Sequence, residues 1–157
     1  MGSLCPQRDP EFFARTVAAA GPGATWMWIG GGEPRYRRVL EDAGVWVSGN
    51  LPRKNMIRLL STADVYVHTA AWEGSCDMLL EAAATGLPIA ARSIPALQAL
   101  KIPGLAQTPE ILAETVMRLI KSPADQRIQC ESFRHAFRSN TRATQSERLY
   151  ELYGLGK

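Results

Sequence analysis

The sequence lacks the features that mark disulfide-rich, membrane-spanning and nucleic-acid-binding proteins. Its three cysteines are widely spaced and form no Cys-x-x-Cys pair, which argues against a disulfide framework or a zinc site and favours a reducing compartment. No apolar run approaches the roughly 20 residues of a membrane span, and the N-terminus lacks the apolar core of a signal peptide. No block of like charges or RNA-binding aromatic signature occurs, so nucleic acid is not an expected partner. We therefore expect a cytoplasmic protein.

What the sequence does contain is ordinary for a globular protein. Its 157 residues, 46% hydrophobic and 21% charged, suit one domain with a sizeable core. The formal net charge of +3 is mild and permits contact with phosphates or an anionic surface. The first three residues, Met1-Gly2-Ser3, resemble an expression scar. We therefore expect the chain to be a piece of a larger protein.

Short apolar segments alternate with helical patterns along the chain. Two helix starts carry a capping residue, then Pro, then an acid: Asp9-Pro10-Glu11 and Thr108-Pro109-Glu110. The alternation predicts βαβ units and a parallel sheet. The expected strands are 25–29, 45–47, 65–67, 89–91 and, weakly, 105–106; the expected helices are 10–20, 34–43, 53–62, 75–85, 108–121, 123–139 and 142–153, with one helical turn at 96–100.

The fold class that follows is α/β: a single Rossmann-like, doubly wound parallel sheet flanked by helices, with a helical C-terminus, forming one domain over residues 1–157. Only residues 1–6 precede the first helix, and Pro6 cannot donate a ladder hydrogen bond. The first strand is therefore expected to be short or missing. The last helix is expected to bear Leu149, Leu152 and Tyr153 on one side.

Two carboxylates mark the candidate site. Glu73 follows the strand 65–67, and Glu81 lies one to two turns into the next helix. Open α/β sheets bind ligands outside the carboxyl ends of their strands, against helix N-termini. Gly74 would let the backbone approach a ligand closely. From the spacing alone, Glu81 as a solvated helix residue and Glu73 as an acid complementing the helix dipole remain open alternatives.

The same stretch resembles a known family. Glu73-Gly74, then Glu81, then Gly86-Leu87-Pro88-Ile89 is similar to the donor-binding signature of the family 4 retaining glycosyltransferases, which have the GT-B fold. Further similar motifs occur in the order expected of the C-terminal, donor-binding half of such an enzyme: Leu4-x-x-Gln7-Arg8-Asp9-Pro10, Trp28-Ile29-Gly30-Gly31-Gly32, Val47-x-Gly49 and Leu59-Leu60-x-x-Ala63-Asp64-Val65.

The resemblance implies roles for individual residues. Glu73 would be the catalytic residue, contacting the transferred sugar or steadying positive charge at its anomeric carbon, and Glu81 would hold the ribose hydroxyls. Arg8 would neutralise the diphosphate. The remaining implied donor-binding residues are Gly30, Leu51 (beside the base), Gly74, Ser75, Cys76, Asp77 and Met78, the last two through their backbone amides.

The sequence departs from the family pattern in two places. Gly74-Ser75-Cys76 stands where the family often has Gly-Phe-Gly, and Ser3 stands where a phosphate-binding Arg usually precedes Leu4. His68, which ends a strand beside the site, is interpreted as a turn residue rather than a catalytic base, and Cys76, Trp26 and Trp28 as packing residues. The basic residues at 35, 37 and 38 are interpreted as a solvated helix face rather than a membrane contact.

The expected function is that of the nucleotide-sugar donor-binding domain of a retaining hexosyltransferase acting on a glycan, lipid or small-molecule acceptor. Its donor would be a UDP-, GDP- or ADP-sugar, with no metal or other cofactor. Its partner would be an N-terminal acceptor-binding domain in the same gene or in trans, without which the chain would be inactive. Peripheral contact with the inner membrane face through the full-length enzyme is allowed. The alternatives are a non-catalytic nucleotide-binding or regulatory α/β module, or a GT-B-like sugar-nucleotide epimerase.

Overall fold

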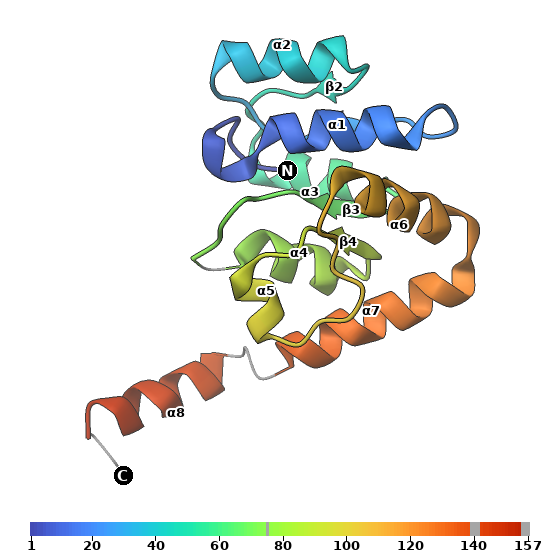
Figure 1. Cartoon of the computed structure of the whole chain (residues 1–157). Helices are drawn as coiled ribbons and strands as arrows, with labels where there is room; N and C mark the ends of the chain where they lie inside the picture. Colours follow the sequence, from blue (N-terminus) through green and yellow to red (C-terminus); the bar gives the residue numbers. More distant parts are fainter. Residues whose placement is uncertain (75, 139–141, 155–157) are drawn as a thin grey trace.

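The computed structural model describes residues 1–74, 76–138 and 142–154, in which short parallel strands alternate with longer helices (Figure 1). The strands are β1 (Met27–Trp28), β2 (Trp46–Val47), β3 (Tyr66–His68) and β4 (Ile89–Ala91). The helices are a 3-10 turn η1 (Pro6–Arg8), α1 (Pro10–Ala20), α2 (Pro34–Asp42), α3 (Arg53–Leu60), α4 (Asp77–Thr85), α5 (Pro95–Ala99), α6 (Pro109–Lys121), α7 (Pro123–Phe137) and α8 (Arg142–Leu152).

The strands pair in parallel, as predicted. β1 pairs with β2, and β3 pairs with β4 with Tyr66 opposite Ile89. Residues before the first helix contribute one parallel bridge, between Leu4 and Gly32, so the first strand is indeed short. Among the described residues β1 and β3 are not joined by hydrogen bonds, so the pairing consists of two separate two-stranded ladders. The α/β class with flanking helices is confirmed.

Helices cover both faces of these strands. Along β3, Tyr66 packs into a core with Leu79 of α4 and Phe133 of α7. Its neighbour Val67 packs on the other side, against the cores that contain residues of α1 and α6. Successive strand residues point to opposite faces, so both faces are buried. Apolar side chains on both faces are typical of parallel strands covered by helices.

The predicted helix starts are confirmed in atomic detail. Asp9 accepts a hydrogen bond from the Phe12 amide at 3.0 Å, and Thr108 accepts one from the Ile111 amide at 3.4 Å. Ser122 caps α7 in the same way, and Pro occupies the first turn of all three helices. A side-chain acceptor at the cap satisfies an amide that has no partner within the helix, which fixes where the helix begins.

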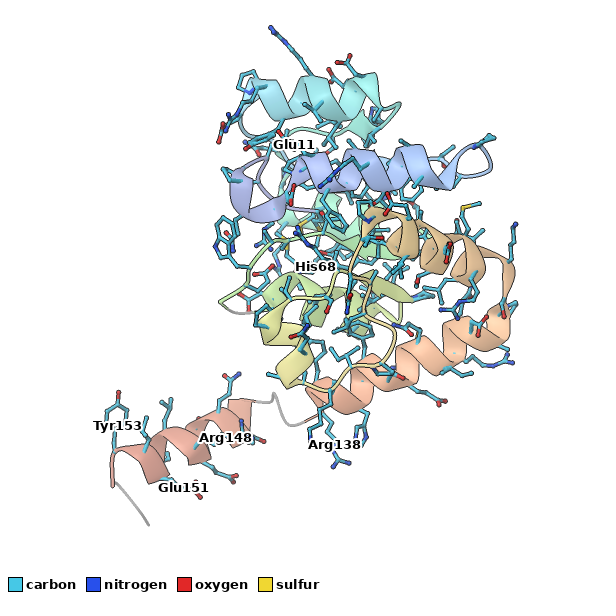
Figure 2. The ribbon with its side chains drawn as sticks, viewed as in Figure 1. Glu11, His68, Arg138, Arg148, Glu151 and Tyr153 are labelled. Carbon is cyan, nitrogen blue, oxygen red and sulfur yellow. The ribbon has the colours of Figure 1, made fainter. Side chains whose placement is uncertain are left out.

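Other sequence expectations need correction. The strand expected over 25–29 shortens to Met27–Trp28, and the one at 105–106 is a single bridge between Arg92 and Ala106. The last helix forms as expected, but among the described residues its apolar side is largely exposed: Leu152 is 76% exposed and Tyr153 is 71% exposed. Figures 1 and 2 show α8 lying apart from the body, with Tyr153 at its outer end. Apolar residues at helical spacing predict the helix but not a surface for it to cover.

Candidate functional site

The candidate site lies where the chain leaves β3 and enters α4. The loop between them carries Glu73 and Gly74, and α4 begins at Asp77. The segment of residues 6–9 crosses over this loop. Thr69 donates from its hydroxyl to the Arg8 carbonyl at 2.9 Å, and the Ala71 amide donates to the Gln7 carbonyl at 2.8 Å. Two segments far apart in sequence are thus held together at the carboxyl ends of the strands.

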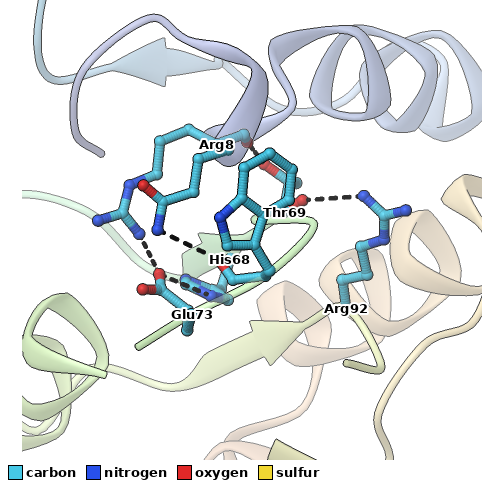
Figure 3. A network of polar contacts seen from close by, with 7 residues as sticks. Arg8, His68, Thr69, Glu73 and Arg92 are labelled. Carbon is cyan, nitrogen blue, oxygen red and sulfur yellow. Dashed lines mark hydrogen bonds and ion pairs between the residues drawn. The ribbon is translucent and has the colours of Figure 1, made fainter. Parts of the chain in front are cut away.

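Arg8 and Glu73 form the central ion pair of the site (Figure 3). The Arg8 guanidinium donates through Nη1 to Oε1 of Glu73. The side chain of Glu73 is 3% exposed and that of Arg8 is 18% exposed, so the carboxylate is shielded and the guanidinium reaches the surface. Burial raises the pKa of Glu73, and the Arg8 charge opposes that rise. The sequence placed both residues in one site, and the structure brings them into contact.

His68 completes the cluster beneath this pair. It is the last residue of β3 and is 3% exposed, and its Nε2 lies 3.5 Å from Oε1 of Glu73. Burial, aided by the N-terminal ammonium and Arg8, lowers the pKa of His68 to about 3, so the imidazole is neutral at physiological pH. Nε2 is buried and has no hydrogen-bond partner among the residues that the structure describes. The interpretation of His68 as a turn residue is therefore wrong, because it is a buried strand residue facing the site.

A second ion pair ties the site to β4. Arg92, which follows β4, donates from Nη1 to Oδ2 of Asp9 at 2.6 Å and to the Thr69 carbonyl at 3.3 Å. Its guanidinium also lies over the Phe12 ring, 4.2 Å from the centroid. Asp9 has a left-handed φ of 47°, and its other oxygen caps α1. Arg92 and Asp9 therefore anchor the turn that carries Arg8.

Glu81 has a partner that the sequence analysis missed. On α4, its Oε1 accepts from Nη1 of Arg53, the first residue of α3, at 2.6 Å. The side chain of Glu81 is 28% exposed and that of Arg53 is 71% exposed, so the pair is accessible. Each of the two predicted carboxylates therefore holds an arginine in this structure.

Gly30 has a structural explanation of its own. It has φ 139°, and a Cβ there would lie 2.1 Å from the Gly2 carbonyl oxygen. Only glycine allows the segment of residues 2–4 to pass so closely. Its predicted contact with a donor remains a prediction.

The other predicted donor-binding residues surround the start of α4 and the loop before α3. Gly74 is exposed, and a Cβ there would meet no heavy atom within 4 Å, so its backbone is open to a ligand. Leu51, Cys76 and Met78 are half-buried and pack against the core beneath α4. Burial raises the pKa of the Cys76 thiol, in keeping with a packing role. Asp77 is exposed in the first turn of α4. Ser75 lies outside the described residues.

Arg53 and Arg92 are polar residues of this region that the sequence analysis missed, and His68 is one that it named without giving it a role in the site. Two of them carried a usable signal, because His68 ends β3 and Arg92 directly follows β4, at the carboxyl ends where ligands bind. Arg53 carried no such signal in the sequence, because its ion pair with Glu81 depends on how α3 packs beside α4. Among the described residues, no group of three or more His, Cys, Asp or Glu side chains is arranged to hold a metal ion. None of the described helices is both long and apolar enough to cross a membrane.

Comparison with known proteins adds a family and a fold. The family described as "Glycosyl transferases group 1" matches residues 1–122. The structure of Anabaena HepE in complex with UDP is similar, with a TM-score of 0.79 and 17% identity, covering 99% of this chain and 48% of HepE. Sucrose-phosphate synthase from Thermosynechococcus elongatus gives a TM-score of 0.75 and 21% identity, covering 99% of this chain and 45% of the synthase.

A third similar structure is AviGT4, a glycosyltransferase involved in avilamycin A biosynthesis, with a TM-score of 0.69 and 22% identity, covering 98% of this chain and 49% of that chain. At such identities the likeness establishes the fold. The chain spans about half the length of these three structures. No curated protein sequence matches it.

Proposed function

Because this chain belongs to the family of group 1 glycosyl transferases, we propose that it is the nucleotide-sugar donor-binding domain of a retaining glycosyltransferase. The enzyme would transfer a hexosyl unit to a glycan, lipid or small-molecule acceptor. Residues 1–157 would form one domain of a two-domain enzyme whose other, N-terminal half binds the acceptor. The observation that carries the proposal is the Arg8–Glu73 pair, with His68 beneath it, at the N-terminal end of α4.

The start of α4 is suited to a diphosphate. Helix N-termini present unpaired amides and a favourable dipole to anions, and the open backbone at Gly74 permits close approach. Arg8 reaches the surface beside this point and can offer two parallel N–H groups to a phosphate. When the donor binds, Arg8 would turn from Glu73 to the diphosphate.

Release from Arg8 would free Glu73 for the sugar. A carboxylate can accept hydrogen bonds from sugar hydroxyls, or stabilise positive charge that develops at the anomeric carbon in the transition state. Its shielded position strengthens such electrostatic effects, because the local dielectric is low. Glu81 would exchange Arg53 for the ribose hydroxyls in the same way.

Calorimetry of the chain with UDP, GDP and ADP, and with their sugar conjugates, tests the proposal. UDP is the first choice, since HepE is similar and its structure contains UDP. We expect binding to one of these nucleotides, weakened about tenfold or more by Glu81→Ala, since two hydrogen bonds to a charged acceptor are lost. Glu114→Ala is the matched control, because Glu114 is an exposed glutamate on another helix, α6.

The outcomes separate the proposal from its alternatives. Glu73→Gln should weaken binding of the sugar conjugate more than binding of the bare nucleotide, because Glu73 is placed at the sugar. A chain that binds nucleotide equally well with and without both carboxylates would instead be a non-catalytic module. Sugar transfer is expected only after the N-terminal half is added, so transfer by this chain alone would contradict the two-domain assignment.

A further inference from the structure

His68 occupies a position that packing alone does not explain. It ends β3 and is 3% exposed, and its ring lies beside that of Tyr66, with the ring centroids 6.2 Å apart. Among the described residues its Nε2 is buried without a hydrogen-bond partner. A buried polar atom without a partner is destabilising, and an apolar side chain such as Leu would fill the same space without that penalty. The imidazole is therefore expected to have a role beyond filling the core.

The unpaired nitrogen faces the carboxylate of the candidate site. Nε2 lies 3.5 Å from Oε1 of Glu73, the same oxygen that accepts from Nη1 of Arg8 (Figure 3). This separation exceeds the roughly 2.7–3.2 Å of an ordinary N–H···O hydrogen bond. Hydrogen bonds of a site are often long before the ligand binds and shorten in the complex. Oε1 is thus bonded to Arg8 on one side and only approached by the imidazole on the other.

Of these three side chains, the imidazole has the most rigid support. β3 pairs with β4 with His68 opposite Ala91, and the His68 carbonyl accepts from the Arg92 amide at 2.8 Å. Arg8 instead reaches Glu73 through a long side chain that is 18% exposed, and Glu73 lies on the loop after β3. A ligand that enters the site would therefore move Arg8 and Glu73 and leave His68 in place.

The imidazole is neutral, which decides how it can act on Glu73. The charged or titratable groups around it include the Arg8 guanidinium, the N-terminal ammonium, the Tyr66 phenol and the Glu73 carboxylate. Burial is the main reason that the pKa of His68 falls to about 3, and the two cations lower it further. A neutral imidazole has one N–H, and a carboxylate facing Nε2 favours the tautomer that carries the proton there. His68 can therefore donate to Glu73 without cancelling its negative charge.

We propose that His68 is a positioning residue for Glu73: when a diphosphate draws Arg8 away, the Nε2–H of His68 donates to Oε1 and holds Oε2 toward the sugar. The inference rests on the proposed function for the departure of Arg8. Without a new donor, Glu73 would lose its ion-pair partner while its side chain, 3% exposed, is shielded from water. A neutral donor fixes the carboxylate and preserves the charge that would stabilise an electron-poor anomeric carbon.

The first test needs no nucleotide, because Arg8→Met imitates the departure of Arg8. We expect the nitrogen-15 shifts of the His68 ring to show the proton on Nε2. The Nε2–H proton should move downfield relative to the parent, as the hydrogen bond to Glu73 shortens. Arg8→Met/Glu73→Leu should abolish that movement, since the acceptor is gone. His135, the other histidine, is exposed on α7 and is the internal control.

Several results of this test would contradict the inference. A proton on Nδ1, an unmoved Nε2–H in Arg8→Met, or the same movement in Arg8→Met/Glu73→Leu would each overturn it. So would an Arg8→Met protein that fails to fold while the double variant folds, because His68 would then be unable to hold the carboxylate. If neither variant folds, addition of UDP to the parent gives the same readout.

Calorimetry with UDP-glucose separates positioning from packing. His68→Leu should weaken binding at least about tenfold, since a hydrogen bond to a charged group is lost. His68→Gln keeps a neutral N–H donor of similar reach and should retain most of the affinity. Thermal unfolding should rank the two variants in the opposite order, because Leu suits the buried position better than Gln. His135→Leu should change neither quantity.

The two tests distinguish this inference from the proposed function. If the parent binds neither UDP nor UDP-glucose, the proposed function fails, while the Arg8→Met spectra still decide the role of His68. If the parent binds UDP-glucose and His68→Gln binds it no better than His68→Leu, the proposed function stands and the positioning role is wrong.

Discussion

At the scale of single residues, the stability of the domain depends on both members of the Arg8–Glu73 pair. Removing the guanidinium leaves a shielded carboxylate without compensation, and breaking a buried pair is more costly than deleting an exposed one. We expect Arg8→Met to lower the free energy of unfolding by about 2–3 kcal/mol, measured by urea denaturation. The double variant Arg8→Met/Glu73→Gln should regain part of that loss.

The Arg37–Glu41 pair on α2 is the matched control. It joins residues one turn apart at 3.0 Å, with side chains 38% and 48% exposed. Arg37→Met should cost less than about 0.5 kcal/mol, as exposed helix pairs do. Equal losses for Arg8→Met and Arg37→Met would show that the first pair is not shielded in solution.

His68 gives the domain a defined pH dependence. Its pKa is about 3 in the folded state and ordinary, near 6.5, when unfolded. Between these values the unfolded chain binds more protons, so stability is lost as the pH falls from 6.5 toward 3. At pH 4.5 this amounts to about 2–3 kcal/mol. The raised pKa of Glu73 works in the opposite sense, because the folded state takes up that proton first.

Comparing His68→Asn with the parent isolates the imidazole. Asn cannot take up a proton, so the fall in stability between pH 7 and pH 4.5 should shrink by about 2–3 kcal/mol in the variant. Urea denaturation at the two pH values measures this difference. An unchanged slope would mean that His68 is solvated and titrates normally.

At the scale of elements, α8 should contribute little to the stability of the domain. Its apolar side chains remain in solvent, with Leu149 53% and Tyr150 57% exposed. We expect removal of residues 139–157 to change the free energy of unfolding by less than about 1 kcal/mol, since no apolar area leaves the core. Nucleotide binding should also persist. A loss of several kcal/mol would show that α8 packs on the domain in solution.

The helices were easier to predict than the strands, for a physical reason. Asp9, Thr108 and Ser122 cap their helices through bonds within three residues, so their sequence signal is complete in itself. The extent of a strand depends on a partner elsewhere in the chain. The apolar segment 25–29 therefore looked longer than the ladder at Met27–Trp28. Whether the Leu152 side chain is buried depends likewise on another part of the molecule being there to cover it.

At the scale of the whole molecule, the predicted resemblance and the α/β fold are confirmed by the family and by the similar structures. Glu73 and Glu81 could be assigned to one region because they follow the carboxyl end of a predicted parallel strand, and the resemblance to the glycosyltransferase family added Arg8 to that region. Their ion pairs could not be predicted, because Arg53 and His68 reach them only through the packing of α3 and β3. The fold class could be predicted from sequence patterns, whereas the ion pairs of the site became visible only in the three-dimensional structure.

The two ion pairs have a consequence for discrimination among ligands. Each predicted carboxylate is already paired with an arginine before any ligand binds, Glu73 with Arg8 and Glu81 with Arg53. A free sugar that displaced Arg8 would leave a cation without an anion, and inorganic phosphate that captured Arg8 would leave Glu73 without a cation. A molecule that carries an anion and hydroxyls on one skeleton can replace both partners at once. Abundant cellular sugars and phosphate would then be poor competitors, although each carries one of the required groups.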